Sequence, residues 1–177
     1  MEIRALRPGD DRSAFQSGDE ALDRFFRTYA SQNQFRHHLG VTYVAVADVR
    51  VDGGILGFAT VAPGQLEIES LPLAARRRVP RYPLPILRLA RLAVDRSAQS
   101  QGLGSQLLRF VLQLAQRMAK DYGCAGVVVD AQPAAVRFYA RYGFVPLDAL
   151  EGQSETRPRP ALMFLPMRAI DAAIEPP

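Results

Sequence analysis

Two glycines and a glutamine stand at the junction between a strand-like run and a helix-like run. Residues 86–95, ILRLARLAVD, have the composition of a strand, and residues 105–120, SQLLRFVLQLAQRMAK, carry apolar residues at helical spacing. Between them Gln99, Gly102 and Gly104 form the pattern Q-x-x-G-x-G. The first N–H groups of a helix have no partner inside the helix and bind anions, and glycine lets a phosphate approach the backbone closely. The pattern indicates an anion site; a glycine turn that only packs a helix on a sheet is the alternative.

Other chemistries find little support in the sequence. There is no G-x-x-x-x-G-K-[ST] loop, and the dinucleotide pattern G-x-G-x-x-G fails because position 107 is leucine. Cys124 lies in an apolar segment, so we expect a buried core thiol rather than a nucleophile. His37 and His38 end a polar helix, and because no His, Cys or carboxylate spacing suggests a metal, we expect none. Glu67 and Glu69 are open to a general-base role, but a solvated surface is the preferred interpretation.

The elements that must position this loop follow a mixed α/β order. We expect strands at residues 2–6, 41–48, 55–62, 86–95, 124–131 and 161–167. We expect helices at residues 17–39, 102–122 and 133–143, the first capped by Ser17 or Asp19. The first three strands are predicted to be antiparallel. Residues 63–85, rich in proline and arginine, are predicted to be mostly loop with room for a short helix.

Length and composition bound the class of protein. The 177 residues favour a single domain, which we place at residues 1–170, with residues 171–177 as a frayed tail. One cysteine, no apolar leader and no run of about 18 apolar residues indicate a cytoplasmic protein without a membrane span. The net charge is +4, and Lys120 is the only lysine among 22 basic residues. The planar guanidinium of arginine binds phosphate groups well. The positive net charge is therefore compatible with an anionic cofactor or a nucleic acid as ligand. The composition of the genome is the alternative explanation for the many arginines.

Two motifs together resemble a known family. QSQGLG after RLAVD is similar to the acyl-coenzyme A loop of the GNAT N-acetyltransferases, Q/R-x-x-G-x-G/A, and AAVRFYARYGFVPL is similar to their late A-x-x-F-Y-x-x-x-G-F signature. The resemblance covers residues 41–167. It implies an α/β (α+β) fold with a mixed, partly splayed sheet of about six to seven strands and about four helices. It also implies that acetyl-coenzyme A is the co-substrate.

The resemblance carries over to individual residues of the loop and its strand. The amides of residues 101–105 would cradle the coenzyme A pyrophosphate, and the edge of residues 92–94 would pair with the pantetheine arm. The thioester carbonyl would then meet a backbone N–H near Leu92. The residues expected to bind the coenzyme are Leu92, Ala93, Val94, Gln99, Ser100, Gln101, Gly102, Leu103, Gly104 and Ser105.

Tyr139 is the candidate catalytic residue. It matches the tyrosine of the family's F-Y pair, which often faces the coenzyme sulfur. Packing is the alternative, and among Phe138, Tyr139 and Tyr142 we expect Phe138 to belong to the core. A tyrosine with a pKa near ~10 protonates a thiolate with a pKa near ~8.5 uphill by roughly 2 kcal/mol. Tyr139 is therefore expected to stabilise the thiolate by hydrogen bonding as much as to protonate it.

The absence of an evident strong base favours an α-amine as the acceptor. An α-amine with a pKa of ~7.7–8.0 is about one tenth neutral at pH 7, whereas a lysine amine near ~10.4 is almost wholly charged. SGDEALDRFFRTYASQNQ, the PRYPLP segment and LARLAVD also resemble the acetyltransferase toxins of bacterial type II toxin–antitoxin systems. That resemblance implies acetylation of aminoacyl-tRNA, a block of translation and a ribbon-helix-helix antitoxin as partner. It leaves open whether the chain forms a homodimer.

Clustered arginines are the candidates for tRNA contact. ARRRVPRY lies just before the coenzyme strand, and strand alternation alone does not say whether Arg88 or Arg91 faces the site. A solvated loop is the alternative for the cluster. Two other functions stay open: an N-acetyltransferase for a small-molecule or protein amine, and a non-catalytic acyl-coenzyme A module, which the intact loop and Tyr139 disfavour. The tRNA candidates are Arg76, Arg77, Arg78, Arg81 and Arg91.

Overall fold

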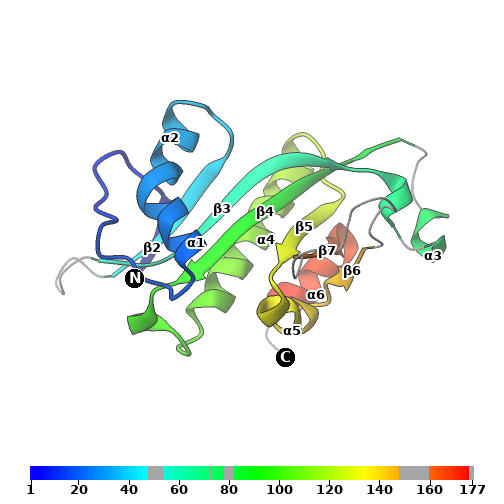
Figure 1. Cartoon of the computed structure of the whole chain (residues 1–177). Coiled ribbons are helices and arrows are strands. Elements are labelled where there is room, and N and C mark those ends of the chain that lie inside the picture. The colour runs from blue at the N-terminus through cyan, green and yellow to red at the C-terminus, as the bar shows by residue number, and fades with distance from the viewer. Residues whose placement is uncertain (48–53, 72, 78–81, 148–159, 176–177) are drawn as a thin grey trace, which may run out of the picture. The chain divides into compact units, whose positions relative to one another are not determined.

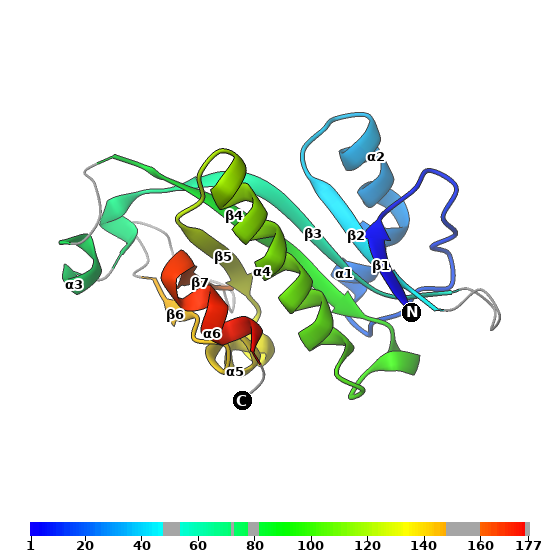
Figure 2. The same cartoon turned by 180° about the vertical axis from the view of Figure 1, so that it is seen from behind.

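The structure is a computed structural model that describes residues 1–47, 54–71, 73–77, 82–147 and 160–175. Within these ranges seven strands form one sheet, in the hydrogen-bonded order β1-β2-β3-β4-β5-β7-β6 (Figures 1 and 2). The expected mixed sheet is confirmed, and the splay at its centre stays a prediction. The strands are β1 (Glu2–Ala5), β2 (Val41–Val46), β3 (Ile55–Leu66), β4 (Leu84–Val94), β5 (Gly126–Ala131), β6 (Val145–Pro146) and β7 (Ala161–Pro166).

The helices and the connecting segment differ from the sequence prediction in their bounds. Helix α1 continues through a π-helical turn (Phe25–Tyr29) into α2 without a break, where the sequence predicts one helix over residues 17–39. The segment predicted to be mostly loop is shorter than residues 63–85, because β3 continues to Leu66 and β4 starts at Leu84. The helices are α1 (Glu20–Arg24), α2 (Ala30–Phe35), α3 (Leu73–Arg76), α4 (Leu103–Asp121), α5 (Val136–Ala140) and α6 (Ile170–Ile174).

The chain divides into two compact units. The first unit contains Met1–Ala62 and Leu89–Val111, and the second contains Pro63–Arg88 and Leu112–Pro177. Strands β3 and β4 and helix α4 each contribute residues to both units. The expected single domain at residues 1–170 stays a prediction.

In the first unit, β1, β2 and β3 are antiparallel, as expected, and their two faces pack against different helices. Val44 opposes Phe58 in the ladder, and both belong to an apolar cluster with Phe25 and Phe26 from the helical run α1–α2. The rings of Phe26 and Phe58 stack with centroids 4.3 Å apart. Phe25 and Phe26 begin the π-helical turn, and both are buried.

The opposite face of these strands carries the first half of α4. The ring of Tyr43, adjacent to Val44 along β2, lies 4.9 Å from that of Phe110, because successive strand residues point to opposite faces. A Cβ atom at Gly57 would lie 3.0 Å from a methyl carbon of Leu107 and 3.0 Å from the carbonyl oxygen of Ala93. Glycine at position 57 therefore lets α4 approach the sheet closely.

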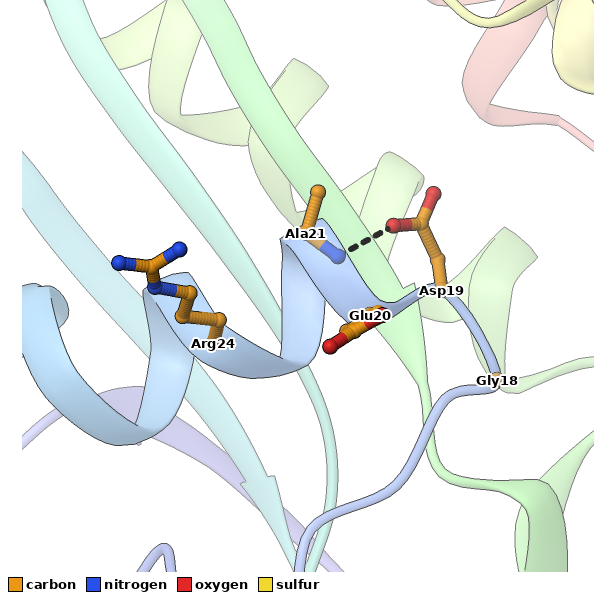
Figure 3. A pocket seen from close by; sticks show the side chains of 5 residues that line it. All are labelled: Gly18, Asp19, Glu20, Ala21 and Arg24. Atoms are coloured by element: carbon orange, nitrogen blue, oxygen red, sulfur yellow. Dashed lines mark hydrogen bonds between the residues drawn. The ribbon is translucent and has the colours of Figure 1, made fainter.

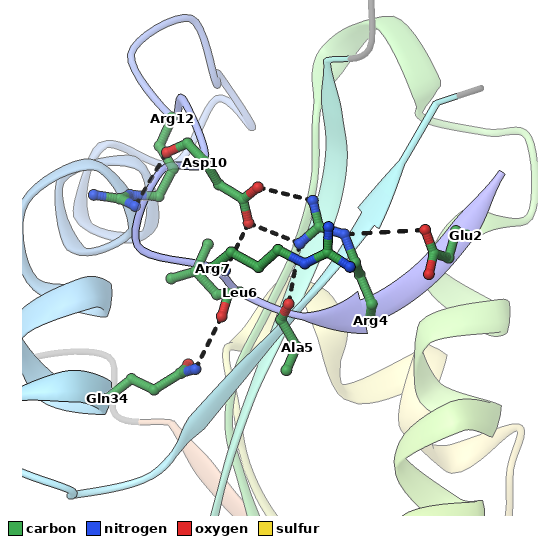
Figure 4. Close-up of polar contacts among 8 residues, drawn as sticks. All are labelled: Glu2, Arg4, Ala5, Leu6, Arg7, Asp10, Arg12 and Gln34. Carbon is green, nitrogen blue, oxygen red and sulfur yellow. Dashed lines mark hydrogen bonds and ion pairs between the residues drawn. The ribbon is translucent and has the colours of Figure 1, made fainter. Parts of the chain in front are cut away.

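Two carboxylates organise the N-terminal segment. Asp19 is the N-cap of α1, and its side chain accepts hydrogen bonds from the N–H groups of Ala21 and Leu22, so Asp19 and not Ser17 caps the helix. Asp10 accepts two hydrogen bonds of 2.8 Å from the Arg4 guanidinium and one of 2.7 Å from the Arg7 N–H (Figure 4). Arg4 and Asp10 thereby fasten the loop after β1 to the strand.

The second unit packs β5 and β7 as an antiparallel pair. Val128 opposes Phe164 in the ladder, and both join an apolar cluster with Leu66 of β3 and Ile86 of β4. The two-residue strand β6 pairs with β7 and was not predicted, because two residues carry no periodic pattern.

The expectation of a frayed tail at residues 171–177 is wrong for residues 171–174. These residues belong to α6, in which Ile170 and Ala173 are buried. The Gln116 side chain also donates a hydrogen bond of 2.6 Å to the Asp171 carboxylate. The apolar residues of DAAIEPP therefore have a packing role that a short terminal sequence does not reveal. No helix in the described part of the chain is long and apolar enough to cross a membrane.

Candidate functional site

The glycine loop lies where the sequence predicts it, between the end of β4 at Val94 and the start of α4 at Leu103. Gly102 has φ +79° and Ser100 has φ +61°, both in the left-handed region. A Cβ atom at Gly102 would meet nothing of the chain within 4 Å. The loop therefore needs glycine for its backbone conformation, and the space beside that glycine is open to a ligand.

The N-terminus of α4 presents free backbone donors. The first hydrogen bond of this turn runs from the Gln106 N–H to the Gly102 carbonyl, 3.1 Å. The N–H groups of Leu103, Gly104 and Ser105 precede it and have no acceptor inside the helix. The first turn contains no acidic residue that would occupy the positive end of the dipole. The geometry fits a bound phosphate group, as the Q-x-x-G-x-G pattern predicts.

Gln99 has a structural role that the sequence did not reveal. Its side-chain amide donates one hydrogen bond of 2.7 Å to the carbonyl of Ser17 and one of 3.0 Å to the carbonyl of Val94. Similarly, the Gln101 side chain donates to the carbonyl of Ser97, 3.0 Å. Both glutamines were predicted to bind the coenzyme. Their side-chain amide groups hold the loop in shape. Coenzyme binding by these two residues stays a prediction, with the backbone N–H groups of the loop as the candidate ligand contacts.

A second set of contacts joins the loop to the N-terminal segment. The Gln16 N–H donates to the Asp95 carboxylate, and the Arg96 N–H donates to the Gln16 carbonyl. Desolvation raises the pKa of Asp95, but hydrogen bonds from Ser97 and Gln16 outweigh it, so the pKa is below its usual value. No sequence motif marks Gln16 or Ser17 as part of the site, because both act through backbone groups.

Strand β4 directs Arg91 toward the α1–α2 run. Ala93 belongs to the apolar cluster that contains Phe25, and strand alternation places Arg91 on the same face as Ala93. The Arg91 guanidinium carbon lies 3.8 Å from the centroid of the Phe25 ring. Burial lowers the pKa of Arg91, which stays charged at neutral pH. Arg88, in contrast, pairs with Asp130 in the second unit, so the structure separates the two arginines that the sequence left equivalent.

Arg91 lines a cavity of about 210 Å³ in the first unit. Its other walls come from α2, from the following segment, and from β2, β3 and β4; Asn33, Thr42 and Thr60 supply polar atoms. The Thr42 and Thr60 hydroxyl groups lie 2.9 Å apart and hydrogen-bond to each other. Arg91 is the one charged residue among the described residues that line the cavity. Arg91 precedes the predicted coenzyme-binding residue Leu92 directly.

A larger, more open hollow of about 640 Å³ lies at the N-terminus of α1 (Figure 3). Glu20 and Arg24 line it, together with Asp19, whose carboxylate caps the helix. Gly18, also in its lining, has a backbone φ of +96° and lies beside the Arg96 side chain. The hollow therefore adjoins the glycine loop through Gly18, and its carboxylates disfavour an anion there.

Tyr139 lies in α5 in the second unit and is 5% exposed. Its ring packs edge-on against Phe144, with centroids 5.5 Å apart, and against Phe138 at 5.1 Å. Burial raises the pKa of Tyr139 far above the usual value, so the hydroxyl stays protonated at neutral pH. Phe138 is half-buried and contacts Tyr142, so the expectation that Phe138 belongs to the core is wrong. The short helix turns position 139 inward and leaves position 138 at its flank.

The predicted tRNA-contact arginines differ in their environments. The Arg76 guanidinium donates hydrogen bonds to the backbone carbonyls of Leu71 and Glu69, at 2.7 and 2.6 Å, and so holds the segment before α3. Arg77 is exposed at the turn after α3. Arg78 and Arg81 lie outside the described residues. Of the two arginines of this cluster that the structure describes, Arg77 is the one whose side chain is exposed to a partner.

The remaining candidates behave as the sequence suggests. Cys124 is buried, its thiol donates to the carbonyl of Gly126, and burial raises its pKa, as expected for a core thiol. Glu67 and Glu69 are exposed, in agreement with a solvated surface. His37 and His38 are exposed after α2. Among the residues that the structure describes, no three His, Cys, Asp or Glu side chains gather in a metal-binding group.

The chain is similar to known acetyltransferases in sequence and in structure. Residues 38–146 match the family described as acetyltransferase (GNAT) domain. The tRNA-acetylating toxin of Mycobacterium tuberculosis (strain ATCC 25618 / H37Rv) is 34% identical over 142 residues, 80% of this chain and 82% of the relative. AtaT complexed with acetyl-methionyl-tRNAfMet superposes with a TM-score of 0.84 at 26% identity, over 98% of this chain and 99% of that one. A tyrosine-to-phenylalanine variant of AtaT, bound to the C-terminus of the antitoxin AtaR and to acetyl-CoA, superposes with a TM-score of 0.76 at 25% identity, over 97% and 96% of the two chains.

Proposed function

The chain belongs to the GNAT acetyltransferase family, and we propose that it transfers the acetyl group of acetyl-CoA to the α-amine of aminoacyl-tRNA and thereby blocks translation. The observation that carries the activity is the loop before α4. There an open left-handed glycine precedes three backbone N–H groups that have no acceptor inside the helix. The relatives named as a tRNA-acetylating toxin and as AtaT with acetyl-methionyl-tRNA support the choice of acceptor.

Acetyl-CoA fits the loop and its strand. The N–H groups of residues 101–105 would hold the pyrophosphate, and the backbone of Leu92 to Val94 would pair with the pantetheine arm. Ala93 is buried in the apolar cluster, so its contribution to binding comes from the backbone. The co-substrate supplies an activated thioester, whose carbonyl carbon the acceptor amine attacks. A backbone N–H near Leu92 would stabilise the developing negative charge on the carbonyl oxygen.

Tyr139 would donate a hydrogen bond to the departing sulfur. Because burial raises the pKa of Tyr139, the hydroxyl is a weaker acid than a solvated tyrosine, and full proton transfer to a thiolate is further uphill. The same burial favours the neutral thiol over the thiolate, which partly restores the balance. The role of Tyr139 is therefore to stabilise negative charge on sulfur and to deliver the proton as that charge develops.

Contact with tRNA would come from Arg77, with Arg78 and Arg81 as further candidates. Arg76 is a weaker candidate because its guanidinium already holds two carbonyl groups. We also propose a ribbon-helix-helix antitoxin as partner and the cytoplasm as the site of action. The AtaT structure with the C-terminus of AtaR supports an antitoxin but not its fold. Co-purification of a small protein encoded next to this chain, followed by its structure, tests that choice.

The decisive experiment follows radiolabel from acetyl-CoA. Purified protein is incubated with charged tRNA, with uncharged tRNA and with free amino acids, and the label in each is counted. We expect label only in charged tRNA. Equal labelling of free amino acids or polyamines would contradict the tRNA substrate and place the protein with small-molecule acetyltransferases.

A matched pair of arginine variants tests the role of Arg77 in tRNA binding. Arg77→Glu should weaken tRNA binding. It should also make the slope of log K for binding against log salt concentration shallower, by about 0.7–0.9 for each phosphate that the protein no longer neutralises. Arg76→Gln removes a charge whose donors face the protein, so it should alter stability more than the salt slope. Equal effects of both variants on the slope would show that general charge, and not a specific interaction of Arg77, is responsible.

A further inference from the structure

The cavity that Arg91 lines is partly polar and contains a positive charge, and the proposed reaction assigns no role to it. It combines one cation, three polar side chains and small apolar walls in about 210 Å³. A water molecule occupies about 30 Å³ of the liquid, so the cavity has room for roughly seven waters or one medium-sized side chain. Its walls include Ala30, Gly40, Ala62 and Ala90, whose small size leaves this volume open.

Within the described part of the chain, the charge in this cavity has no counter-charge. No carboxylate among the described residues pairs with Arg91, and none lines the cavity. The Phe25 ring, 3.8 Å from the guanidinium carbon, supports the cation from one side without neutralising it. Burial also reduces the water available to screen it. A second cation entering the cavity would therefore meet repulsion that is weakly screened.

The position of Arg91 along β4 connects the cavity to the reaction. Arg91 and Leu92 are adjacent, and one strand residue advances about 3.3 Å. If the thioester carbonyl meets the N–H near Leu92, the attacking α-amine lies within one residue of Arg91. The α-carbon, and the side chain that it carries, would then lie beside the cavity that Arg91 lines.

We propose that this cavity receives the side chain of the aminoacyl group and that Arg91 excludes cationic side chains from it. The inference rests on the proposed function, because it assigns a subsite and a specificity to that reaction. Neutral side chains are accepted, and lysine and arginine are rejected. Thr42, Thr60 and Asn33 offer hydrogen-bonding partners to a polar neutral side chain.

The test compares two nearly isosteric acceptors on one tRNA body. The same tRNA is charged by a ribozyme with norleucine, with lysine or with glycine, and α-acetylation is measured by chromatography of the released amino acid. We expect norleucine to be acetylated at least about tenfold faster than lysine by the wild-type protein. The use of one tRNA removes differences that come from the nucleic acid.

Two variants separate charge from shape. Arg91→Met keeps a long side chain on the Phe25 ring and removes the charge, so the preference for norleucine over lysine should fall toward one. Arg91→Lys keeps the charge and should keep the preference. An unchanged preference in Arg91→Met would refute the role of Arg91, and so would equal rates for lysine and norleucine in the wild type.

The remaining outcomes distinguish this inference from the proposed function. Acetylation of glycine with rejection of both larger side chains would show that the cavity receives no side chain, and the inference would fail while the function stands. Absence of acetylation on all three charged tRNAs would overturn the proposed function itself. Circular dichroism and acetyl-CoA binding establish that each variant is folded.

Discussion

The side-chain amide of Gln99 lies 2.7 Å from the backbone carbonyl of Ser17, which is 82 residues earlier in the chain. The same amide donates to the carbonyl of Val94 at the end of β4. One side chain thus fixes the glycine loop both to β4 and to the segment that leads into α1. The motif glutamine therefore holds the backbone of the loop that is predicted to contact the coenzyme.

Replacement of Gln99 should loosen the loop. Gln99→Ala removes two hydrogen bonds, and we expect the free energy of unfolding to fall by about 1 kcal/mol. Acetyl-CoA affinity should fall more than stability suggests, because the loop amides lose their fixed geometry. Calorimetry and urea denaturation measure the two effects. Gln106→Ala, which changes an exposed residue in the first turns of α4, serves as the control and should leave both unchanged.

Gly102 offers a test of ligand approach that is separate from folding. Gly102→Asn keeps access to the left-handed region and places a side chain where the chain leaves open space, so the free energy of unfolding should change by less than about 1 kcal/mol. Acetyl-CoA binding, measured by calorimetry, should weaken at least about tenfold.

Gly123→Asn is the matched control for this variant. Gly123 also has a positive φ, +93°, and open space around its Cβ position, but it follows the C-terminal end of α4. We expect its acetyl-CoA affinity to stay at the wild-type value. Unchanged affinity in Gly102→Asn as well would mean that the pyrophosphate binds elsewhere.

Tyr139→Phe isolates the hydroxyl group, because the ring keeps its packing against Phe138 and Phe144. Turnover should fall by about 10²–10⁴-fold, with acetyl-CoA affinity little changed. Tyr142→Phe removes the hydroxyl of the neighbouring half-buried tyrosine and should keep wild-type turnover. The reverse result would transfer the role to Tyr142.

The raised pKa of Tyr139 also predicts a pH dependence. A tyrosine with an ordinary pKa near ~10 would begin to lose its proton above about pH 9. Because burial raises the pKa, Tyr139 should remain a donor through that range, and turnover of the wild-type protein should show no decline from this group between pH 8 and about 10. A decline there that is absent in Tyr139→Phe would contradict the assigned environment.

Asp10 predicts a stability that depends on acid pH. Its hydrogen bonds with the Arg4 guanidinium, despite desolvation, hold the pKa of Asp10 below the usual value. A carboxylate with a lowered pKa in the folded state stabilises the protein above the unfolded pKa of about 3.9, and that stabilisation is lost as the pH falls through the lower folded value. Asp10→Asn should therefore be less stable than the wild type by roughly 1–2 kcal/mol at pH 7.

The difference should shrink below about pH 4, where the wild-type carboxylate also becomes protonated. Urea denaturation at pH 7 and at pH 3 measures it. Asp121→Asn, a change at an exposed carboxylate at the end of α4, is the control and should change stability little at either pH. A difference for Asp10→Asn that stays constant with pH would show that charge does not contribute.

Much of the site follows from short stretches of sequence. The glycine loop, the strand before it and the helix after it lie within a few residues of their predicted positions, because left-handed glycine and helical periodicity are local properties. Tyr139 is likewise proposed as the catalytic residue from a motif of short range in the sequence. The antiparallel pairing of β2 and β3 follows from the hairpin signal between them. β1 pairs with β2 across a long segment that contains α1 and α2, so no local signal specifies that pairing.

The tertiary structure decided how residues distant in sequence meet. Alternation along β4 puts Arg88 and Arg91 on opposite faces without saying which face each one takes. Packing against Phe25 and pairing with Asp130 decide that. The link between Gln99 and Ser17 joins a side chain to a backbone carbonyl, which every residue type possesses, so no residue pattern predicts it. Local sequence sets backbone conformation and the spacing of faces, whereas the partner of each face depends on contacts that form only when the whole chain is folded.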